Sequence, residues 1–242
     1  VTTLVTTPVG LFQGETGFNQ DISSWDMSNV MFTIRMFEGA TSFNQDIGDW
    51  DVSNVTNMAG TFKGATSFNN DSSNSINNWN TSNVTTMEFM FGTTGNFSLD
   101  DAMDFNQDIG DWDVGKVPNF QAMFRNSLFN QDLSDWDVSS ATTLRQMFDQ
   151  TKQFNNGGVS LNCWDTSSAT DMDWMFHLTL INQDLSNWCV ASVTAPSPIT
   201  NFGNIGGTNP TWGAACSGNS VVISFSDETK IFGDPNFTVT AT

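Results

Sequence analysis

The chain has 242 residues, and its 7 Lys and Arg against 26 Asp and Glu give a formal net charge of −19. So acidic a surface repels nucleic acid and anionic lipid, which argues against both as partners. Hydrophobic residues make up 38% of the chain, too many for a disordered acidic polypeptide, and no apolar run reaches the roughly 18 residues of a membrane span. We therefore expect a folded protein without direct membrane insertion.

Residues 1–17 have the pattern of the end of a repeat. Val5 lies one period before Val30, and Phe12 lies one period before Phe37. The first full copy of the repeat begins at residue 18, so the sequence predicts a fragment of a longer protein.

Residues 18–188 are an array of copies of a segment best seen at 43–62, FNQDIGDWDVSNVTNMAGTF. In the first six copies a phenylalanine follows a tryptophan at a constant twelve residues. These pairs are Trp25 and Phe37, Trp50 and Phe62, Trp79 and Phe91, Trp112 and Phe124, Trp136 and Phe148, and Trp164 and Phe176. Because this spacing never changes, we predict that both aromatic residues belong to the core.

Each copy predicts one short helix and one short strand. Val55, Met58 and Phe62 have the spacing of one helix face, with Ser53 as the N-cap and Gly64 as the C-terminal stop. The Phe-Asn-Gln-Asp-Ile half is too short for a helix and is expected to pair with its equivalents in a parallel sheet. The sequence thus predicts an α/β solenoid, a leucine-rich-repeat-like right-handed coil with a period of about 25 residues. An all-β solenoid has a similar period, but the helical spacing argues against it.

Two insertions interrupt the array, at 70–78 and 92–104. Since irregular loops on a rigid scaffold commonly carry binding functions, we predict that these two loops contact the ligand. The candidate ligand-binding residues are Asn74, Asn77, Asn78, Asn96, Asp100, Asp101 and Asp104. The acidic cluster of Asp100, Asp101 and Asp104 is also a candidate Ca²⁺ site, and no other cofactor is expected.

Aspartates recur at two positions of the repeat. One row is Asp21, Asp46, Asp71, Asp108, Asp132 and Asp184, and the other is Asp26, Asp51, Asp113, Asp137 and Asp165. Unit charges about 4.8 Å apart repel by roughly 1 kcal/mol in water, so the rows need compensation. Our main interpretation is that each carboxylate accepts a backbone N–H in a turn, and the alternative is Ca²⁺ bound between the coils.

The sequence contains no constellation typical of catalysis. Its one histidine, His177, directly follows Phe176 and is interpreted as a helix-end residue, because no nucleophile motif accompanies it. No glycine-rich phosphate loop is present. The repeated carboxylates single out no acid in an apolar pocket, which a glycosidase requires. We therefore expect that the protein is not an enzyme.

The regular pattern ends near residue 188. Residues 189–217 are interpreted as a C-terminal capping unit, since an array has to cover its hydrophobic end. Cys189 and Cys216 flank this unit and are predicted to form a disulfide, which implies export, while the unpaired Cys163 is interpreted as a buried small apolar residue. Residues 218–242 are rich in β-formers and predict either a hairpin on the cap or the start of a second domain.

The motif Phe-Asn-Gln-Asp-Ile-x-x-Trp-Asp-Val-Ser-Asn-Val-Thr-x-Met-x-x-x-Phe strongly resembles the repeat of BspA-like leucine-rich-repeat bacterial surface proteins. The resemblance covers roughly 18–216, and 187–190 together with 212–216 looks like the terminal unit of Bacteroidetes members. Residues 223–242 resemble the first strands of the Ig-like repeats in long Bacteroidetes adhesins. The resemblance implies a fragment of a large Bacteroidetes cell-surface adhesin, exported by the type IX pathway or used in gliding.

Together these observations predict an extracellular, cell-surface binding or adhesion module without enzymatic activity. Its expected partners are a protein or glycan on a host or neighbouring cell and the other domains of the same long chain. The alternative is a structural spacer in a large exported filament or in a phage receptor-binding fibre.

Overall fold

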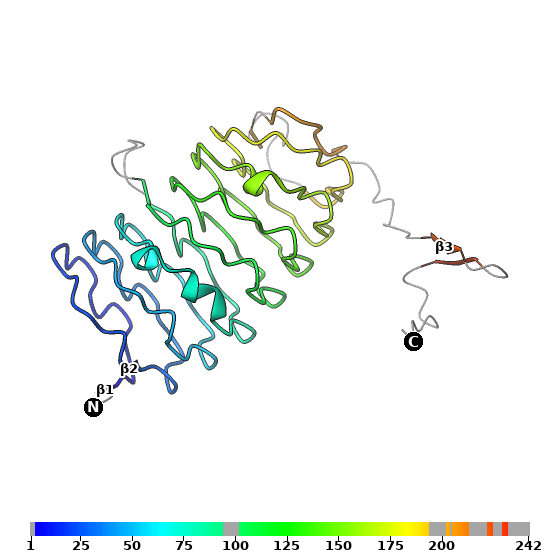
Figure 1. Ribbon diagram of the computed structural model, residues 1–242. Helices are drawn as coiled ribbons and strands as arrows, with labels where there is room; N and C mark the ends of the chain where they lie inside the picture. Colours follow the sequence, from blue (N-terminus) through cyan, green and yellow to red (C-terminus); the bar gives the residue numbers. More distant parts are fainter. Residues whose placement is uncertain are drawn as a thin grey trace.

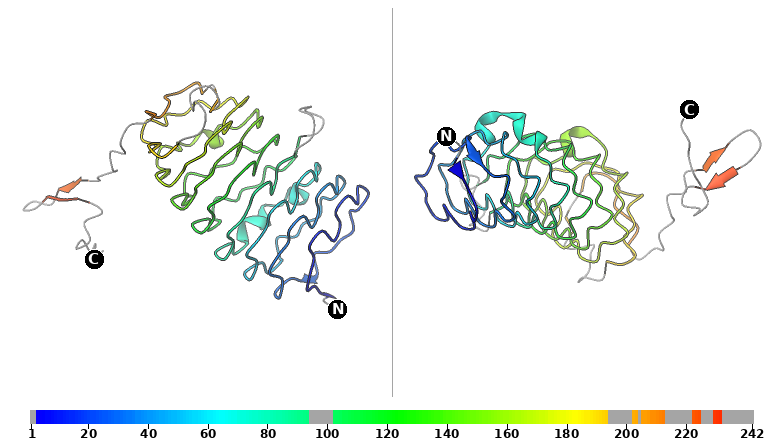
Figure 2. Two further views of the ribbon diagram at one scale, coloured as in Figure 1. Left: turned by 180° about the vertical axis from the view of Figure 1, so that it is seen from behind. Right: turned by 90° about the horizontal axis from the view of Figure 1, so that it is seen from below.

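The computed structural model describes residues 3–93, 102–193, 202–203, 205–212, 222–224 and 229–231. The array winds in successive coils that lie side by side along one axis (Figures 1 and 2). Very little of it is regular secondary structure. The elements are β1 (Thr3–Leu4), β2 (Trp25–Asp26), η1 (Asn70–Ser72), η2 (Asn74–Asn78), η4 (Asn156–Gly158), β3 (Val222–Ser224) and β4 (Thr229–Ile231). Among the described residues no helix has the length and hydrophobicity needed to cross a bilayer.

The strands form two pairs. Strands β1 and β2 pair in parallel, with Thr3 opposite Trp25, and β3 and β4 pair antiparallel, with Val222 opposite Ile231. Elsewhere among the described coils, β-type pairing is limited to isolated parallel bridges, such as the one between Phe32 and Asn57.

The predicted α/β fold with one helix and one parallel strand per repeat is therefore wrong. The segments predicted as helices are runs of tight turns, and their N–H groups alternate between two uses. Those of Met36 and Glu38 donate three residues back along the chain, at 3.0 and 3.1 Å. Those of Arg35 and Phe37 donate to the next coil, at 3.0 and 2.8 Å. An α-helix uses its interior N–H groups within itself, so this division excludes one.

Residues with positive φ recur at two positions in the coils. The leading row lies two residues before the core phenylalanine of each coil and consists of Gly10, Arg35, Gly60, Phe89, Ala122, Gln146 and Trp174. The trailing row lies two residues after it and consists of Gly14, Gly39, Gly64, Asn126, Gln150 and Leu178. A left-handed residue every fourth position ends any α-helix. The apolar spacing that predicted a helix therefore arises from a chain of turns. We call the surface of the two rows and the residues between them the turn face.

The core consists of stacked aromatic rings. Phe37 stacks on Phe43 in its own coil at 4.0 Å between ring centroids, and on Phe62 of the next coil at 5.4 Å. The predicted burial of the core aromatic residues is confirmed for Phe37 onward and for Trp50 onward. The core indoles also donate to a carbonyl of the preceding coil, as Trp50 does to Ile22 at 3.1 Å, and the same bond is made by Trp79, Trp112, Trp136, Trp164 and Trp188. Such aromatic pairs contribute roughly 0.5–1.5 kcal/mol each beyond their burial.

The asparagine at the second position of each copy, such as Asn44 after Phe43, forms a ladder through the coils. Asn19 Oδ1 accepts the N–H of Asn44 at 2.9 Å, and Asn44 Oδ1 accepts the N–H of Asn69 at 2.8 Å. The asparagine ladder consists of Asn19, Asn44, Asn69, Asn106, Asn130, Asn155 and Asn182. Each bond joins equivalent positions of adjacent coils and contributes about 1 kcal/mol, so the ladder holds the register of the stack.

Most aspartates of the two rows cap turns, which confirms our main interpretation of them. Asp26 Oδ1 accepts the hydroxyl of Ser28 at 2.6 Å and its N–H at 3.1 Å, and these bonds lower the pKa of Asp26. The same bond to the N–H two residues on is made by Asp21, Asp46, Asp51, Asp108, Asp113, Asp132, Asp137, Asp165 and Asp184. Asp71 differs because it lies in η1 with positive φ.

Cys189 is disulfide-bonded. Cys163 is a free thiol, and because it is exposed, its predicted burial is wrong. The predicted partner of Cys189, Cys216, lies outside the described residues.

Candidate functional site

The predicted ligand loop at 70–78 is bound to the stack. Ile76 is buried, and its carbonyl accepts the indole N–H of Trp112 at 2.9 Å. The Asn77 amide donates to Asp111 Oδ2 at 2.7 Å and accepts the Asp111 N–H at 3.1 Å. The other two predicted contacts of this loop are exposed: Asn74 and Asn78. The insertion therefore continues the core and the contacts between coils.

A sequence signal accompanies this kind of insertion. Where the motif reads Phe-Asn-Asn instead of Phe-Asn-Gln, the second asparagine is buried and takes positive φ, as at Asn70 and Asn156. Asn70 Oδ1 accepts the N–H of Ile47 at 2.9 Å, and Asn156 Oδ1 accepts the N–H of Leu133 at 2.7 Å. The extra residues are thus held by a specific internal bond.

The second predicted loop, 92–104, is described only at its ends. Asn96, Asp100 and Asp101 lie outside the described residues. Asp104 is exposed, and its N–H donates to the carbonyl of Thr66 at 2.8 Å. The predicted Ca²⁺ site therefore has no described geometry. Within the described ranges, no group of three or more His, Cys, Asp or Glu side chains is placed to hold a metal ion.

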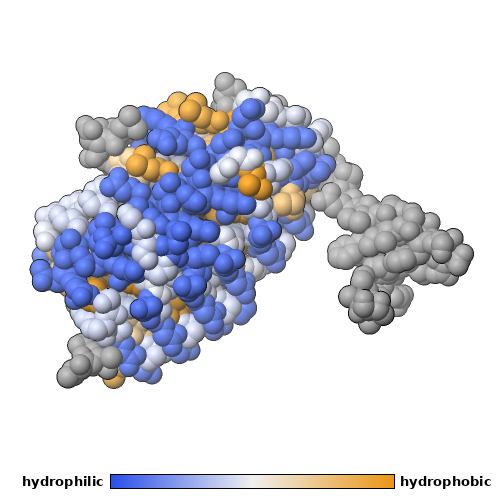
Figure 3. Space-filling model, in the orientation of Figure 1, coloured by the Kyte–Doolittle hydropathy of each residue, from blue (hydrophilic) through white to orange (hydrophobic). Residues whose placement is uncertain are grey.

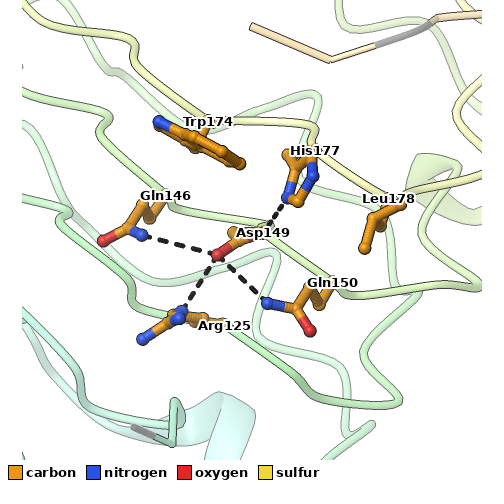
Figure 4. A pocket seen from close by; sticks show the side chains of 7 residues that line it. All are labelled: Arg125, Gln146, Asp149, Gln150, Trp174, His177 and Leu178. Atoms are coloured by element: carbon orange, nitrogen blue, oxygen red, sulfur yellow. Dashed lines mark hydrogen bonds and ion pairs between the residues drawn. The ribbon is translucent and has the colours of Figure 1, made fainter. Parts of the chain in front are cut away.

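A pocket of about 340 Å³ lies on the turn face, across the coils whose core residues are Phe124, Phe148 and Phe176. It is lined by Arg125, Gln146, Asp149, Gln150, Trp174 and His177, with exposed Leu178 at one side (Figure 4). None of these residues was predicted as a binding residue.

Asp149 is the central anion of the pocket. Its side chain is only 2% exposed, and both oxygens are bound: Oδ1 lies 2.8 Å from His177 Nδ1, and Oδ2 lies 2.9 Å from Arg125 Nε. Since a carboxylate only accepts hydrogen bonds, the Nδ1–H group of His177 is the donor in this contact. A buried carboxylate is tolerated when it is paired in this way.

Two glutamine amides approach the same carboxylate more loosely. The Nε2 atoms of Gln146 and Gln150 each lie 3.5 Å from Asp149 Oδ2, at the limit of a hydrogen bond. Within the described part of the chain, neither side-chain carbonyl oxygen accepts a hydrogen bond from the protein. Both amides therefore keep acceptor and donor capacity for a ligand.

The indole of Trp174 forms one side of the pocket and is half-buried (Figure 4). Its ring meets His177 edge to face, with centroids 4.3 Å apart and planes at 83°. Trp174 has a φ of 62°, a conformation that costs a bulky residue about 1 kcal/mol or more. Such strain is concentrated at functional sites in proteins.

Some exposed hydrophobic side chains lie in the same C-terminal coils as the pocket. Figure 3 shows a mostly hydrophilic face with hydrophobic atoms toward the top, where the C-terminal coils lie. Leu178 and Leu180 are 57% and 75% exposed.

The sequence does contain a signal for this site. In the leading and trailing rows, glycines give way to Gln146, Gln150, Trp174 and Leu178 toward the C-terminus. Once the copies are aligned, Trp174 is found at a position that Gly10 and Gly60 hold in two of the earlier copies. The predicted binding residues instead lie in the insertions, and His177, interpreted from the sequence as a helix-end residue, lies in a turn.

The chain matches the family described as "Mycoplasma protein of unknown function, DUF285" over three overlapping ranges, 1–100, 72–160 and 98–201. The chain belongs to this family. The match covers all lining residues of the pocket in this DUF285 protein. Comparison with curated proteins and with solved structures gives no match.

The DUF285 match corrects the expected origin of the chain. The placement in a Bacteroidetes leucine-rich-repeat family of BspA-like adhesins is wrong, because the matching family is associated with Mycoplasma. The expectations of type IX export and gliding depended on that placement and fall with it. What the DUF285 match supports is a repeat protein, and the family description assigns it no activity.

Proposed function

We propose that this DUF285 chain is a non-enzymatic binding module of a cell-surface protein, and that the pocket on its C-terminal coils holds the ligand. The proposed ligands are proteins or glycans on a host or neighbouring cell. The observation that carries the proposal is a pocket of about 340 Å³ whose polar groups keep unused hydrogen-bonding capacity.

The rest of the stack supports this choice of site. In the regular coils, the asparagine ladder and the turn-capping aspartates use their side chains to hold the coils. A ligand would have to compete with those bonds. In the pocket, Gln146 and Gln150 offer amides that the fold uses only weakly.

The chemistry of the pocket favours binding over catalysis. A carboxylate that orients a histidine also occurs in hydrolases, where the histidine activates a nucleophile. Among the described residues that line the pocket, there is no Ser, Thr, Cys or Lys that could be this nucleophile. Asp149 is also neutralised by Arg125, so it is not placed to act as a base.

The cell-surface location remains part of the proposal and is supported by the disulfide at Cys189, since disulfides persist in oxidising compartments outside the cytosol. Other domains of the same long chain are proposed as further partners.

The alternative function is a structural spacer, which the regular stacking of the coils favours. Binding of the labelled chain to cultured animal cells and to bacterial cells distinguishes the binding module from the spacer. We expect saturable binding that Trp174→Ala abolishes and Phe89→Ala leaves intact, because Phe89 holds the same row position outside the pocket. Absence of binding to either cell type and to immobilised surface proteins and glycans would favour the spacer.

A further inference from the structure

We propose that the pocket recognises one neutral sugar ring of a glycan, stacked on Trp174 and hydrogen-bonded by Gln146 and Gln150. This inference rests on the proposed binding function and names the class of its ligand. It follows from the kinds of side chain in the pocket, from their pairing and from the size of the space.

The first observation is the aromatic wall. The indole of Trp174 is half-buried, and its edge-to-face contact with His177 fixes its orientation. A fixed, partly exposed indole offers a flat apolar surface with a polar edge. One face of a pyranose ring carries mainly C–H groups and is flat enough to lie on such a surface. A flexible aliphatic side chain would not offer this shape.

The second observation is the pair of amides. A sugar hydroxyl both donates and accepts, and so does a glutamine amide. Gln146 and Gln150 come from the same coil, on the two sides of Phe148, and both Nε2 atoms converge on Asp149. Their unused carbonyl oxygens and second amide hydrogens therefore suit neighbouring hydroxyl groups of one ring.

The third observation is the balance of charge. Arg125 is the cation among the described lining residues, and its Nε lies 2.9 Å from the buried Asp149 carboxylate. Because the charge of Asp149 offsets the charge of Arg125, this pair offers an anionic ligand little net positive charge. The pocket is therefore better suited to a neutral ligand than to sialic acid, phosphate or a peptide carboxyl terminus.

The size agrees with this class. Pockets for small molecules have volumes of about 300–1,000 Å³, and a volume of about 340 Å³ lies at the lower end of that range. One ring of a glycan fits such a space, while the rest of the glycan extends along the turn face.

The test uses the 242-residue chain and an array of immobilised neutral and sialylated oligosaccharides, followed by calorimetry with the free neutral glycans that bind. We expect binding to neutral glycans. Trp174→Ala should weaken it by on the order of tenfold or more, because the stacked face is lost. Trp174→Phe should retain part of it, and Gln146→Ala and Gln150→Ala should each weaken it.

Phe89→Ala is the matched control, because Phe89 also has positive φ in the leading row and lies outside the pocket lining. Thermal melts of every variant verify that the fold is kept. Neutral-glycan binding that survives Trp174→Ala in a folded protein would overturn the inference, and so would binding restricted to sialylated glycans. If no glycan binds but cells still bind through Trp174, the sugar inference fails and the proposed function stands. If neither glycans nor cells bind, both fail.

Discussion

The N-terminal coils have the core residues Phe12, Phe37 and Phe62, and the C-terminal coils have the core residues Phe124, Phe148 and Phe176. The two regions have the same backbone arrangement and differ on the turn face. Of the six residues of the leading and trailing rows in the N-terminal coils, five are glycines: Gly10, Gly14, Gly39, Gly60 and Gly64, with Arg35 as the sixth. In the C-terminal coils no residue of these two rows is glycine: they are Ala122, Asn126, Gln146, Gln150, Trp174 and Leu178. Glycine adopts this conformation freely, whereas most other residues are strained there, asparagine less than the others. The C-terminal coils thus accept strain where they form a pocket.

The charges of the two regions differ in the same way. Directly after the core phenylalanine stand Glu38 in an N-terminal coil and Asp149 in a C-terminal coil. Glu38 is 20% exposed and lies 2.8 Å from Lys63, whereas Asp149 is 2% exposed and bound by Arg125 and His177. The same repeat position therefore carries a surface ion pair at one end and a buried charge cluster at the other.

Truncation of the core should have the largest effect, and it should be the same in both regions. Phe37 and Phe148 are both fully buried between stacked rings. We expect Phe37→Ala and Phe148→Ala each to lower the free energy of unfolding by about 3–5 kcal/mol, measured by urea denaturation with tryptophan fluorescence. If one of the two losses of unfolding free energy exceeded the other by more than about half, the two regions would differ in their cores as well.

Removal of the paired carboxylate should separate the regions most clearly. Asp149→Asn leaves the charge of Arg125 uncompensated and is expected to cost about 3–5 kcal/mol of unfolding free energy. Glu38→Gln breaks a surface pair, and its cost is expected to stay below about 1 kcal/mol. Urea denaturation of both variants measures the contrast, and equal losses would contradict the distinction between surface and buried pairs.

Exchange of glycine and glutamine in the trailing row tests the strain itself. Gly64 has a φ of 68°, and an added Cβ would lie 3.9 Å from the backbone of Gly39, so the site has room for a side chain. Gly64→Gln should therefore cost about 1 kcal/mol through backbone conformation alone. Gln150→Gly should relieve strain and leave stability unchanged or about 1 kcal/mol higher, while ligand binding is lost. Thermal melts and the glycan array report the two effects, and a clear loss of stability in Gln150→Gly would refute the strain argument.

Acid should have the smallest effect and should weaken the N-terminal coils more. The hydroxyl and then the N–H of Ser53 hold the pKa of Asp51 below its ordinary value of 3.8, and Ser139 does the same for Asp137. A carboxyl with a lowered folded-state pKa contributes stability above its unfolded pKa and loses it as the pH falls through the folded pKa. Lowered pKa values occur at Asp21, Asp26, Asp46 and Asp51 toward the N-terminus, and at Asp137 and Asp184 toward the C-terminus.

We therefore expect the melting temperature to fall as the pH drops below about 4, with a smaller fall in Asp51→Asn and Asp137→Asn than in the unchanged protein. Melts at steps between pH 7 and pH 3 measure this. An identical fall in all three proteins would exclude these turn caps as the source of acid sensitivity.

The repeat, its aromatic core and its aspartate-capped turns were predictable, because each follows from a constant spacing between chemically distinct residues. The helix was not, since Val55, Met58 and Phe62 would point inward both from a helix and from a chain of turns. The chain of turns forms because every second N–H group donates to a carbonyl of the next coil, and a single copy of the repeat does not reveal these bonds. The pocket required the alignment of three coils, because Arg125, Gln146 and Trp174 are separated in the chain and meet only through stacking.

The asparagine ladder has a direction. In all six of its bonds the N–H belongs to the later coil and the acceptor to the earlier one. A finished coil therefore presents an open acceptor to the segment that follows it. A ribosome releases the N-terminal coil first, so each new coil meets its template already in place and settles in register on it. The array can in this way be lengthened by whole copies, with every added rung guided by the one before.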